Sequence, residues 1–396
     1  MRIDAHVHYL PPMTAEELAQ FCRQEPYWGL LVAPDDDGES LQGWATADRM
    51  IEDMDRAGID RVVIQGEYRL THQACVERNN QALALIRRWP DRLTAFAVLQ
   101  PAAGQRALDE LQRCLDGGLR GVGELNPYAQ GHTLDDADFL HLVEACISYD
   151  IPLNLHANEE VGHYYPGKSA TPLRHYYRLA CRYPELKLIL AHWGGGLFFY
   201  EIMPQVRRDL RNVWYDTAAS PLLYPTSDIF RTALGCVDHR KILYGSDYPL
   251  LLYPRQQQQP DFRPFLEQIE GLDLDPQLRA DIMGGNAARL LGLPVDGGDA
   301  MEPEARQGQA PTRTEGLSPL TVDIPGEPAM GISGFMAVRM VADNWPETRS
   351  VFESYHISWR DSPVPFWEPV VQAAAAQGWG PEDQRRLLDE LNEAIG

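Results

Sequence analysis

The sequence predicts an α/β protein built on a TIM-like (β/α)8 barrel, followed by a small α-helical domain. Short apolar segments alternate with amphipathic segments of helical period from the amino terminus to about residue 292, which is the pattern of parallel βαβ units. Eight such units fit a closed barrel. An open doubly wound sheet is the alternative, but the glycine-rich first turn that is typical of it is missing here.

The eight expected strands are short and mostly apolar. They are residues 2–8, 61–66, 93–99, 121–125, 152–156, 187–192, 213–216 and 241–247. Helical patterns lie between them, over residues 45–57, 72–89, 104–116, 134–149, 171–182, 197–211 and 226–235. The first connection, residues 9–44, is unusually long and holds a short helical piece at 14–18. Such long connections in a compact domain are more often binding loops or lids than linkers.

Charge and hydropathy narrow the class of partner. The chain has 396 residues and a formal net charge of −22, from 57 acidic and 35 basic residues. This balance argues against nucleic acid, because binding to phosphates needs clustered Lys and Arg. The sequence has neither an amino-terminal signal nor an apolar run near the roughly 20 residues that span a bilayer. We therefore expect a cytoplasmic protein that acts on a small molecule, with no membrane partner.

Polar residues at the carboxyl ends of the strands are the candidates for chemistry, because barrel enzymes carry their active sites there. His6 and His8 are two residues apart, and a strand directs alternate side chains to the same side, so they would form a pincer for a metal ion. His156, His192 and Asp247 end the fifth, sixth and eighth strands. Imidazole and carboxylate together form a known zinc-binding set, so these five positions predict a metal site.

These segments resemble the metal-dependent amidohydrolase superfamily, in particular its amidohydrolase-related branch, which also contains non-oxidative decarboxylases and lactonases. The resemblance covers about residues 1–292 and is carried by Asp4-Ala5-His6-Val7-His8, His156-Ala157-Asn158-Glu159, Ala191-His192-Trp193-Gly194-Gly195 and Tyr244-Gly245-Ser246-Asp247-Tyr248-Pro249. It implies zinc or another divalent metal held by His6, His8, His156 and Asp247. It also implies that His192 either polarises the substrate or ligates a second metal.

A hydrolytic mechanism is consistent with these residue types. Zinc lowers the pKa of a bound water to about 7, which makes a nucleophile available at neutral pH. Asp247 could accept the proton of that water and pass it to the leaving group, while His192 could stabilise charge that develops on the substrate oxygen. Glu159 resembles the Glu of the His-x-x-Glu arrangement in superfamily deaminases, where it is a proton shuttle. The alternative is a solvated loop carboxylate, since Glu160 lies next to it.

The number of metal ions depends on Glu124, which ends the fourth strand. Some members of the superfamily carry a bridging carboxylate at this place. If Glu124 bridges two ions, His156 and His192 would bind the second one. If it does not, it orients a ligand histidine from outside the metal's own ligand set. We favour one tightly held ion over two, and we expect Asp216 to cap backbone groups rather than to support the site.

Aromatic and basic residues near the predicted site are assigned to substrate binding. They are Tyr164, Tyr165, Lys168, Trp193 and Tyr248. Lys168 could anchor a substrate carboxylate in an otherwise acidic protein. The glycines that follow Trp193 would let the backbone approach the site closely, because glycine has no Cβ.

The chain changes character after residue 294, where we expect the barrel domain, residues 1–294, to end. Residues 295–330 have the Gly-, Pro- and charge-rich composition of a flexible linker. Helical periodicity returns in residues 331–396. The run from Val338 to Ile357, with Trp345-Pro346-Glu347-Thr348-Arg349-Ser350-Val351-Phe352 at its centre, resembles a small helical domain found at the amino end of iron–sulfur cluster repair proteins. The adjacent cysteines of that domain are missing, because no cysteine follows Cys236. We therefore expect a docking or dimerisation module, so a homo-oligomer is among the expected states.

The sequence leaves two catalytic functions and one non-catalytic alternative. The first is a hydrolase that uses a metal-activated water on an amide, ester or lactone of a small molecule, because Glu124 and Glu159 offer carboxylates for proton transfer. The alternative is non-oxidative decarboxylation of a small aromatic or unsaturated acid, which the Gly-Ser-Asp-Tyr-Pro segment does not exclude. The non-catalytic alternative is a scaffold protein, which would purify without metal.

Overall fold

A computed structural model of the chain contains a closed barrel of eight parallel strands. Its strands are β1 (Ile3–Val7), β2 (Arg61–Ile64), β3 (Leu93–Ala95), β4 (Val122–Leu125), β5 (Leu153–Leu155), β6 (Leu188–Leu190), β7 (Val213–Asp216) and β8 (Ile242–Leu243). Hydrogen bonds join β1-β2-β3 and β4-β5-β6-β7-β8 in sequence order. Parallel bridges from Ala97 to Val122 and from Val7 to Tyr248 close the two gaps. The predicted barrel is confirmed, and each observed strand lies within its predicted segment.

The structure describes residues 1–32, 40–162, 165, 168–169, 171–254 and 256–294, and towards the carboxyl terminus 332, 334, 336, 338, 341–342, 345–359 and 370–395. The predicted linker, residues 295–330, lies outside this part of the chain. Among the described residues, no helix has the length and apolar character to cross a membrane.

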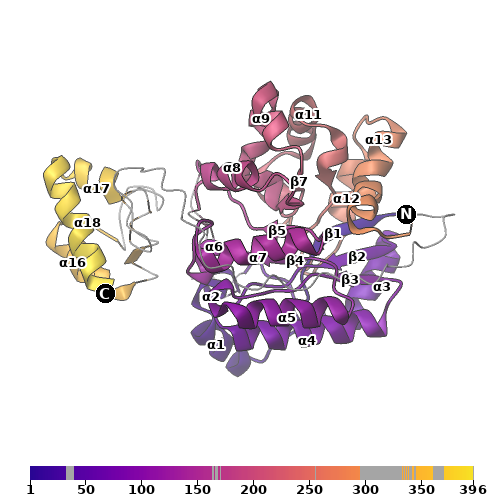
Figure 1. Cartoon of the computed structure of the whole chain (residues 1–396), viewed down its shortest axis with the longest axis horizontal. Coiled ribbons are helices and arrows are strands. Elements are labelled where there is room, and N and C mark those ends of the chain that lie inside the picture. The colour runs from indigo at the N-terminus through magenta and orange to yellow at the C-terminus, as the bar shows by residue number, and fades with distance from the viewer. Residues whose placement is uncertain are drawn as a thin grey trace.

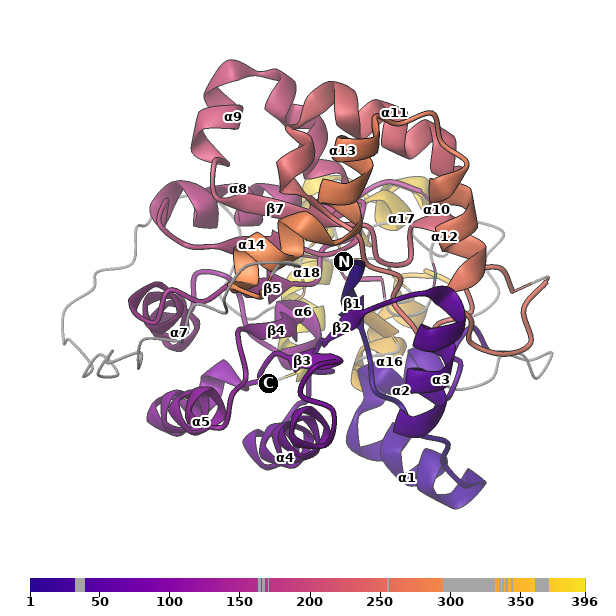
Figure 2. The ribbon, with the colours of Figure 1, turned by 90° about the vertical axis from the view of Figure 1, so that its right-hand side faces the viewer.

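Helices surround the barrel, as Figure 2 shows. They are α1 (Ala15–Gln24), α2 (Pro26–Val32), α3 (Ala47–Ala57), α4 (His72–Arg88), α5 (Gln105–Asp116), α6 (Pro127–Gln130), α7 (Ala137–Ser148), α8 (Leu173–Arg182), α9 (Pro204–Asp209), α10 (Ser220–Leu223), α11 (Thr226–Cys236), α12 (Arg263–Glu270), α13 (Pro276–Ala280) and α14 (Asn286–Leu291). Threonines begin several of them: the Thr14, Thr46 and Thr71 hydroxyls accept hydrogen bonds from the first turns of α1, α3 and α4. Such caps satisfy backbone N–H groups that lack a partner inside the helix.

The segment after β6 differs from the prediction of one helix over 197–211. A 3-10 segment, η2 (His192–Ile202), comes first and α9 follows it. The backbone φ angles of Trp193, Gly194, Gly195 and Gly196 are 58°, 58°, 59° and 95°, which a right-handed α-helix does not allow. This glycine-rich turn carries His192 at its start, so its irregular backbone is part of how the site is built.

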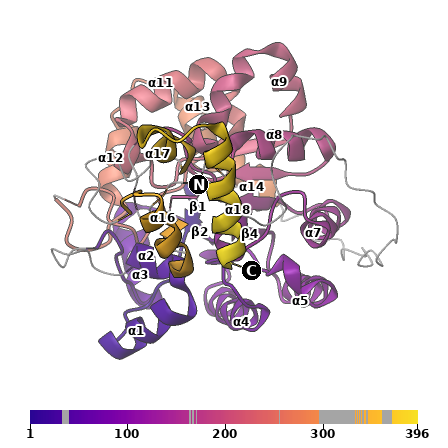
Figure 3. The same cartoon turned by 90° about the vertical axis from the view of Figure 1, so that its left-hand side faces the viewer.

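The hydrophobic core separates into a barrel part and a carboxyl-terminal part. Apolar residues between Ile3 and Leu293 form the barrel clusters. A further cluster contains only residues between Ile332 and Leu391, from α16 (Arg349–Ser354), α17 (Val370–Ala376), α18 (Pro381–Ile395) and neighbouring described residues. These helices are yellow in Figure 1 and face the viewer in Figure 3. The predicted helices are therefore present, whereas the domain boundary and the docking role stay predictions.

Candidate metal centre

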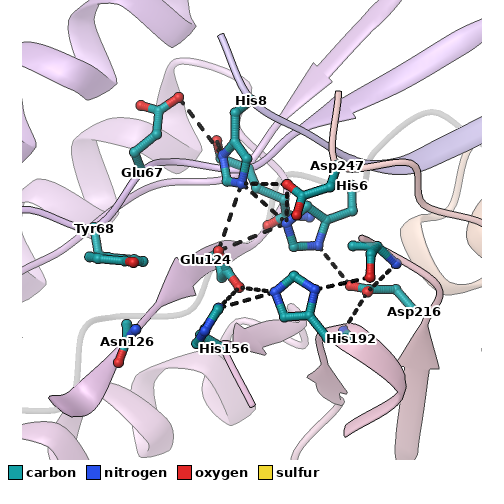
Figure 4. A network of polar contacts seen from close by, with 12 residues as sticks. His6, His8, Glu67, Tyr68, Glu124, Asn126, His156, His192, Asp216 and Asp247 are labelled. Atoms are coloured by element: carbon teal, nitrogen blue, oxygen red, sulfur yellow. Dashed lines mark hydrogen bonds and ion pairs between the residues drawn. The ribbon is translucent and has the colours of Figure 1, made fainter. Parts of the chain in front are cut away.

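The histidine pincer of β1 forms as the alternation of a strand predicts. His6 and His8 are both buried, and their Nε2 atoms lie 3.3 Å apart (Figure 4). Asp4, two residues earlier, accepts hydrogen bonds from the backbone N–H groups of His6 and Ser246 through Oδ1. Asp4 therefore supports the backbone at the pincer and does not join it.

The ring partners of the pincer fix which nitrogen carries the proton. His6 Nδ1 lies 2.8 Å from Asp216 Oδ2, and His8 Nδ1 lies 3.3 Å from the backbone oxygen of Gln65. Both partners are acceptors, so each Nδ1 is the N–H donor. In a neutral imidazole the other nitrogen then carries a lone pair. Two lone pairs therefore face each other at the two Nε2 atoms.

Carboxylate oxygens add further acceptors at the same point. Asp247 Oδ1 lies 3.2 Å from His8 Nε2 and 3.9 Å from His6 Nε2. Glu124 Oε2 lies 3.8 Å from both of these nitrogens. With neutral rings this leaves four acceptors and no donor in a buried space. Such an arrangement needs a positive charge at its centre, because buried acceptors without partners are costly.

A second group of acceptors lies on the other side of Glu124. His156 Nδ1 is 2.7 Å from Glu124 Oε1 and 3.1 Å from His192 Nε2, and the latter is 3.4 Å from the same oxygen. His192 Nδ1 donates to the backbone oxygen of Ala218 at 3.0 Å, which leaves Nε2 with the lone pair. Two trios of potential ligands therefore share Glu124: one with His6 and His8, the other with His156 and His192.

The electrostatics of the centre favour positive charge. Burial opposes protonation of His6, but Asp216, Glu124 and Asp247 outweigh it and raise the pKa of His6 to about 10. Burial also opposes protonation of His192, but the Glu124 carboxylate outweighs it and raises the pKa of His192 to about 9. Burial opposes ionisation of Asp247, yet its hydrogen bond with His8 and the nearby histidines lower its pKa to about 2. Protons or metal cations can supply the positive charge that these carboxylates demand.

The donor set fits a divalent metal. Imidazole nitrogen and carboxylate oxygen are ligands of zinc, and manganese also accepts them. The outer partners of the ligand histidines, which are Asp216, Gln65 and Ala218, are of the kind that orients metal-binding imidazoles. Asp216 accepts from the His6 ring through Oδ2 and from the His192 and Ala218 backbone N–H groups through Oδ1. Our assignment of Asp216 to capping alone is therefore incomplete.

The structure does not bring all predicted site residues to the centre. His156 groups with His192, and not with His6 and His8 as one mononuclear set would require. The Tyr248 hydroxyl donates to Asp53 on α3, and its ring stacks on Phe262. Trp193 is buried, and its indole N–H donates to Ser220. Neither Trp193 nor Tyr248 therefore has a free polar group directed at the centre.

The loop after β5 holds three more predicted residues. Glu159 Oε1 lies 3.0 Å from Lys168 Nζ, and Glu159 Oε2 accepts the Tyr165 hydroxyl at 3.1 Å. Tyr165 in turn accepts a hydrogen bond from the side chain of Asn158. Asn158 connects this group to the centre, because its Oδ1 lies 2.9 Å from His156 Nε2. Tyr164 lies outside the described residues.

An aromatic wall, Trp28 and Tyr68, adjoins the centre and was not predicted. The Trp28 ring lies 6.0 Å from His8, and the Tyr68 ring lies 6.2 Å from His156. The two rings pack on each other at 5.0 Å, and the indole N–H of Trp28 donates to the backbone oxygen of Tyr68. For Trp28 the length of the connection after β1 was the available signal, because α2 lies inside it; Tyr68 follows β2, where the sequence carried no comparable signal.

Fold and site together define a barrel enzyme with a histidine- and carboxylate-lined centre for divalent metal at the carboxyl ends of its strands. Residues 3–293 match the family described as Amidohydrolase. The chain belongs to this family and is an enzyme of the amidohydrolase superfamily.

Solved structures of several enzymes share the fold at low sequence identity. A 5-carboxyvanillate decarboxylase from Sphingomonas paucimobilis is 17% identical, with a TM-score of 0.56 over 73% of this chain and 98% of that one. A dihydroxybenzoic acid decarboxylase from Polaromonas, which holds manganese, is 19% identical with a TM-score of 0.54 over 74% and 97%. A 4-oxalomesaconate hydratase from Rhodopseudomonas palustris is 19% identical with a TM-score of 0.50 over 74% and 95%.

Proposed function

We propose that this enzyme is a metal-dependent hydrolase of a small-molecule amide, ester or lactone, and that Glu124 bridges two cation positions. One observation supports this above all. The two oxygens of Glu124 face different histidine pairs, Oε2 towards His6 and His8 and Oε1 towards His156 and His192. This revises our preference for a single ion. Zinc and manganese both fit the donor set, and we leave the choice open.

The residues take distinct roles in the proposed reaction. His6, His8 and Asp247 hold one cation, His156 and His192 hold the other, and Glu124 lies between them. A bound divalent metal supplies Lewis-acid polarisation and an activated water. Asp247 remains ionised at neutral pH, since its pKa lies near 2, and it accepts the proton of the attacking water. Both oxygens of Glu159 are engaged by Lys168 and Tyr165, so we assign proton transfer to Asp247 instead.

Decarboxylation is the second candidate, and the aromatic wall favours it. Trp28 and Tyr68 place aromatic rings beside His8 and His156, and a planar conjugated acid could make aromatic contacts with them. Two enzymes that share the fold are decarboxylases of aromatic acids by name. Lys168 remains our candidate to anchor a substrate carboxylate, on the condition that the carboxylate displaces Glu159 from it.

Two substrate panels distinguish the candidates. Enzyme loaded with manganese or zinc is assayed on amides, esters and lactones, and carbon dioxide release is measured from dihydroxybenzoate-type acids. We expect hydrolysis, and we expect Asp247→Asn to lower kcat by about 100-fold or more, since general bases contribute at least that much. Carbon dioxide release without hydrolysis would replace the first candidate by the second. Metal-loaded enzyme that turns over neither panel would contradict both.

A further inference from the structure

The side chain of Asn158 contacts the outer nitrogen of a ligand histidine, and its orientation follows from its neighbours. The backbone N–H of Ser169 donates to the oxygen of the Asn158 amide at 2.7 Å. A backbone N–H can only donate, so the atom that faces it must be Oδ1. The same Oδ1 lies 2.9 Å from His156 Nε2. His156 Nε2 must therefore be an N–H donor, and in the neutral ring, the form that binds a metal, Nδ1 then keeps the lone pair that faces Glu124.

The amide nitrogen of Asn158 begins a chain of hydrogen bonds with one direction. Asn158 Nδ2 donates to the Tyr165 hydroxyl oxygen at 2.7 Å. The Tyr165 hydroxyl in turn donates to Glu159 Oε2 at 3.1 Å. Glu159 is paired with Lys168 at 3.0 Å, and the Lys168 ammonium lies 5.5 Å from the centre of the Tyr165 ring. Because the oxygen of the Asn158 amide is fixed by the Ser169 N–H, its nitrogen can only face the Tyr165 hydroxyl oxygen.

This series of hydrogen bonds is buried at Asn158 and Lys168 and partly buried at Tyr165 and Glu159. Asn158, Lys168 and Ser169 are each less than 10% exposed. A Cβ on Gly195, in the turn after β6, would lie 2.2 Å from the backbone oxygen of Asn158. The loop that carries His156 and the turn that carries His192 are therefore packed directly on each other at Asn158.

We infer that Asn158 is a positioning residue for the second cation: it holds His156 in the tautomer that presents Nδ1 to the metal, and Tyr165, Glu159 and Lys168 hold Asn158 in that orientation. The inference rests on the proposed function, because it requires the cation position between His156, His192 and Glu124. In the absence of substrate, Glu159 and Lys168 therefore serve to hold Asn158 in its orientation. Outer partners of this kind typically change metal affinity 10- to 100-fold.

Manganese content separates this role from a merely structural one. Full-length protein is loaded with Mn²⁺, freed of excess ion, and examined by metal analysis and by electron paramagnetic resonance, which distinguishes a coupled pair of ions from isolated ones. We expect two coupled ions in the unaltered protein. Asn158→Leu should keep the first ion and bind the second about 10- to 100-fold more weakly, with loss of the coupled signal. Asn158→Asp retains an acceptor for His156 and should keep both ions.

Two further variants test whether the loss of the second ion decreases along the hydrogen-bonded series. A third variant controls for a general loss of stability. Tyr165→Phe and Lys168→Met should weaken the second ion less than Asn158→Leu does, because they act one and three steps further along the chain. Asn212→Leu removes a comparable hydrogen bond, to the backbone oxygen of Pro184, before β7 at the opposite end of the barrel. It should lower the melting temperature without changing the metal content.

The outcomes separate this inference from the proposed function. Two coupled ions in both the unaltered protein and Asn158→Leu would overturn the role of Asn158 and leave the bridged centre intact. Equal loss of both ions in Asn158→Leu, or loss of the second ion in Asn158→Asp, would also overturn it. Fewer than two ions in the unaltered protein would overturn the inference and the bridged centre together. If Asn158→Leu does not fold, Asn158→Asp and Tyr165→Phe still decide the question.

Discussion

The two histidines of β1 are each fixed by an acceptor from a distant part of the chain. His6 is held by Asp216, 210 residues away, and His8 by the backbone of Gln65, 57 residues away. These contacts direct the lone pairs inwards. The histidines could be found from the sequence, because they follow apolar strands in a recognisable order. Asp216 and Gln65 could not, since their roles depend on how distant strand ends meet.

Asp216→Asn tests the fixed tautomer at His6. The amide could keep accepting from the His192 and Ala218 backbone through Oδ1, but its NH₂ group would face His6 Nδ1. His6 would then carry its proton on Nε2, where the metal should bind. We expect the affinity of the cation beside His6 and His8 to fall about 10- to 100-fold, measured by competition with a coloured chelator.

A surface carboxylate provides the control for this substitution. Asp238 pairs with Arg240 at the surface, so Asp238→Asn should leave metal affinity unchanged. Equal affinities for the unaltered protein and Asp216→Asn would show that the tautomer of His6 is not fixed in this way.

At the scale of elements, strands were predictable and the turn after β6 was not. A two-residue alternation and apolar runs identify the strands, since side-chain burial sets that pattern directly. The periodicity predicted one helix over residues 197–211, but positive φ angles at Trp193–Gly196 precede it, the 3-10 segment continues to Ile202, and α9 begins only at Pro204. The close approach of Gly195 to Asn158 supplies the reason for glycine there, and it involves a residue 37 positions earlier in the chain.

Gly195→Ala and Gly196→Ala form a matched pair for this turn. Both residues have positive φ, so alanine strains the backbone at each by about 1–2 kcal/mol. Of the two, only Gly195 has other atoms within 4 Å of the new Cβ, namely the Asn158 backbone and the Leu173 side chain. We expect Gly195→Ala to destabilise by about 1–3 kcal/mol more than Gly196→Ala and to weaken the second metal. Equal melting temperatures and metal contents would refute the close packing.

The connection between α6 and α7 carries a buried histidine that gives the fold a pH dependence. The His132 ring stacks on Phe139 of α7, and burial lowers the pKa of His132 to about 4. An unfolded histidine titrates near 6.5, so the unfolded chain takes up this proton first as the pH falls. The contribution to stability is complete above about pH 6.5 and is lost progressively down to about pH 4.

His132→Phe should remove this part of the pH dependence. In metal-free protein, the free energy of unfolding by urea should fall by roughly 3 kcal/mol more between pH 7 and pH 4 in the unaltered protein than in the variant. Parallel pH profiles for the two proteins would mean that His132 has the same pKa in the folded and the unfolded chain.

At the scale of the whole molecule, the described residues form two sets of hydrophobic clusters that share no member. One set ends at Leu293, and the other begins at Ile332. Residues 295–318, which are poor in large apolar side chains, have little to add to either core, and the domain boundary drawn at residue 294 stays a prediction. The function of the carboxyl-terminal helices could not be predicted, since the cysteines that would have suggested one are absent.

A chain shortened to residues 1–294 tests the independence of the barrel. We expect it to fold, to unfold in a single thermal transition, and to bind as much metal as the full chain, because every proposed ligand and every barrel cluster lies within it. Size-exclusion chromatography of both lengths would reveal whether residues 295–396 cause association. An insoluble or metal-free short chain would show that the barrel depends on the later residues.

A crystal structure of manganese-loaded protein, with anomalous differences measured at the manganese absorption edge, tests the bridged centre most directly. We predict two peaks about 3.5–4 Å apart, one beside His6, His8 and Asp247 and the other beside His156 and His192, with Glu124 between them. A single fully occupied peak at saturating manganese, with Glu124 bound to His156 alone, would contradict the bridged centre.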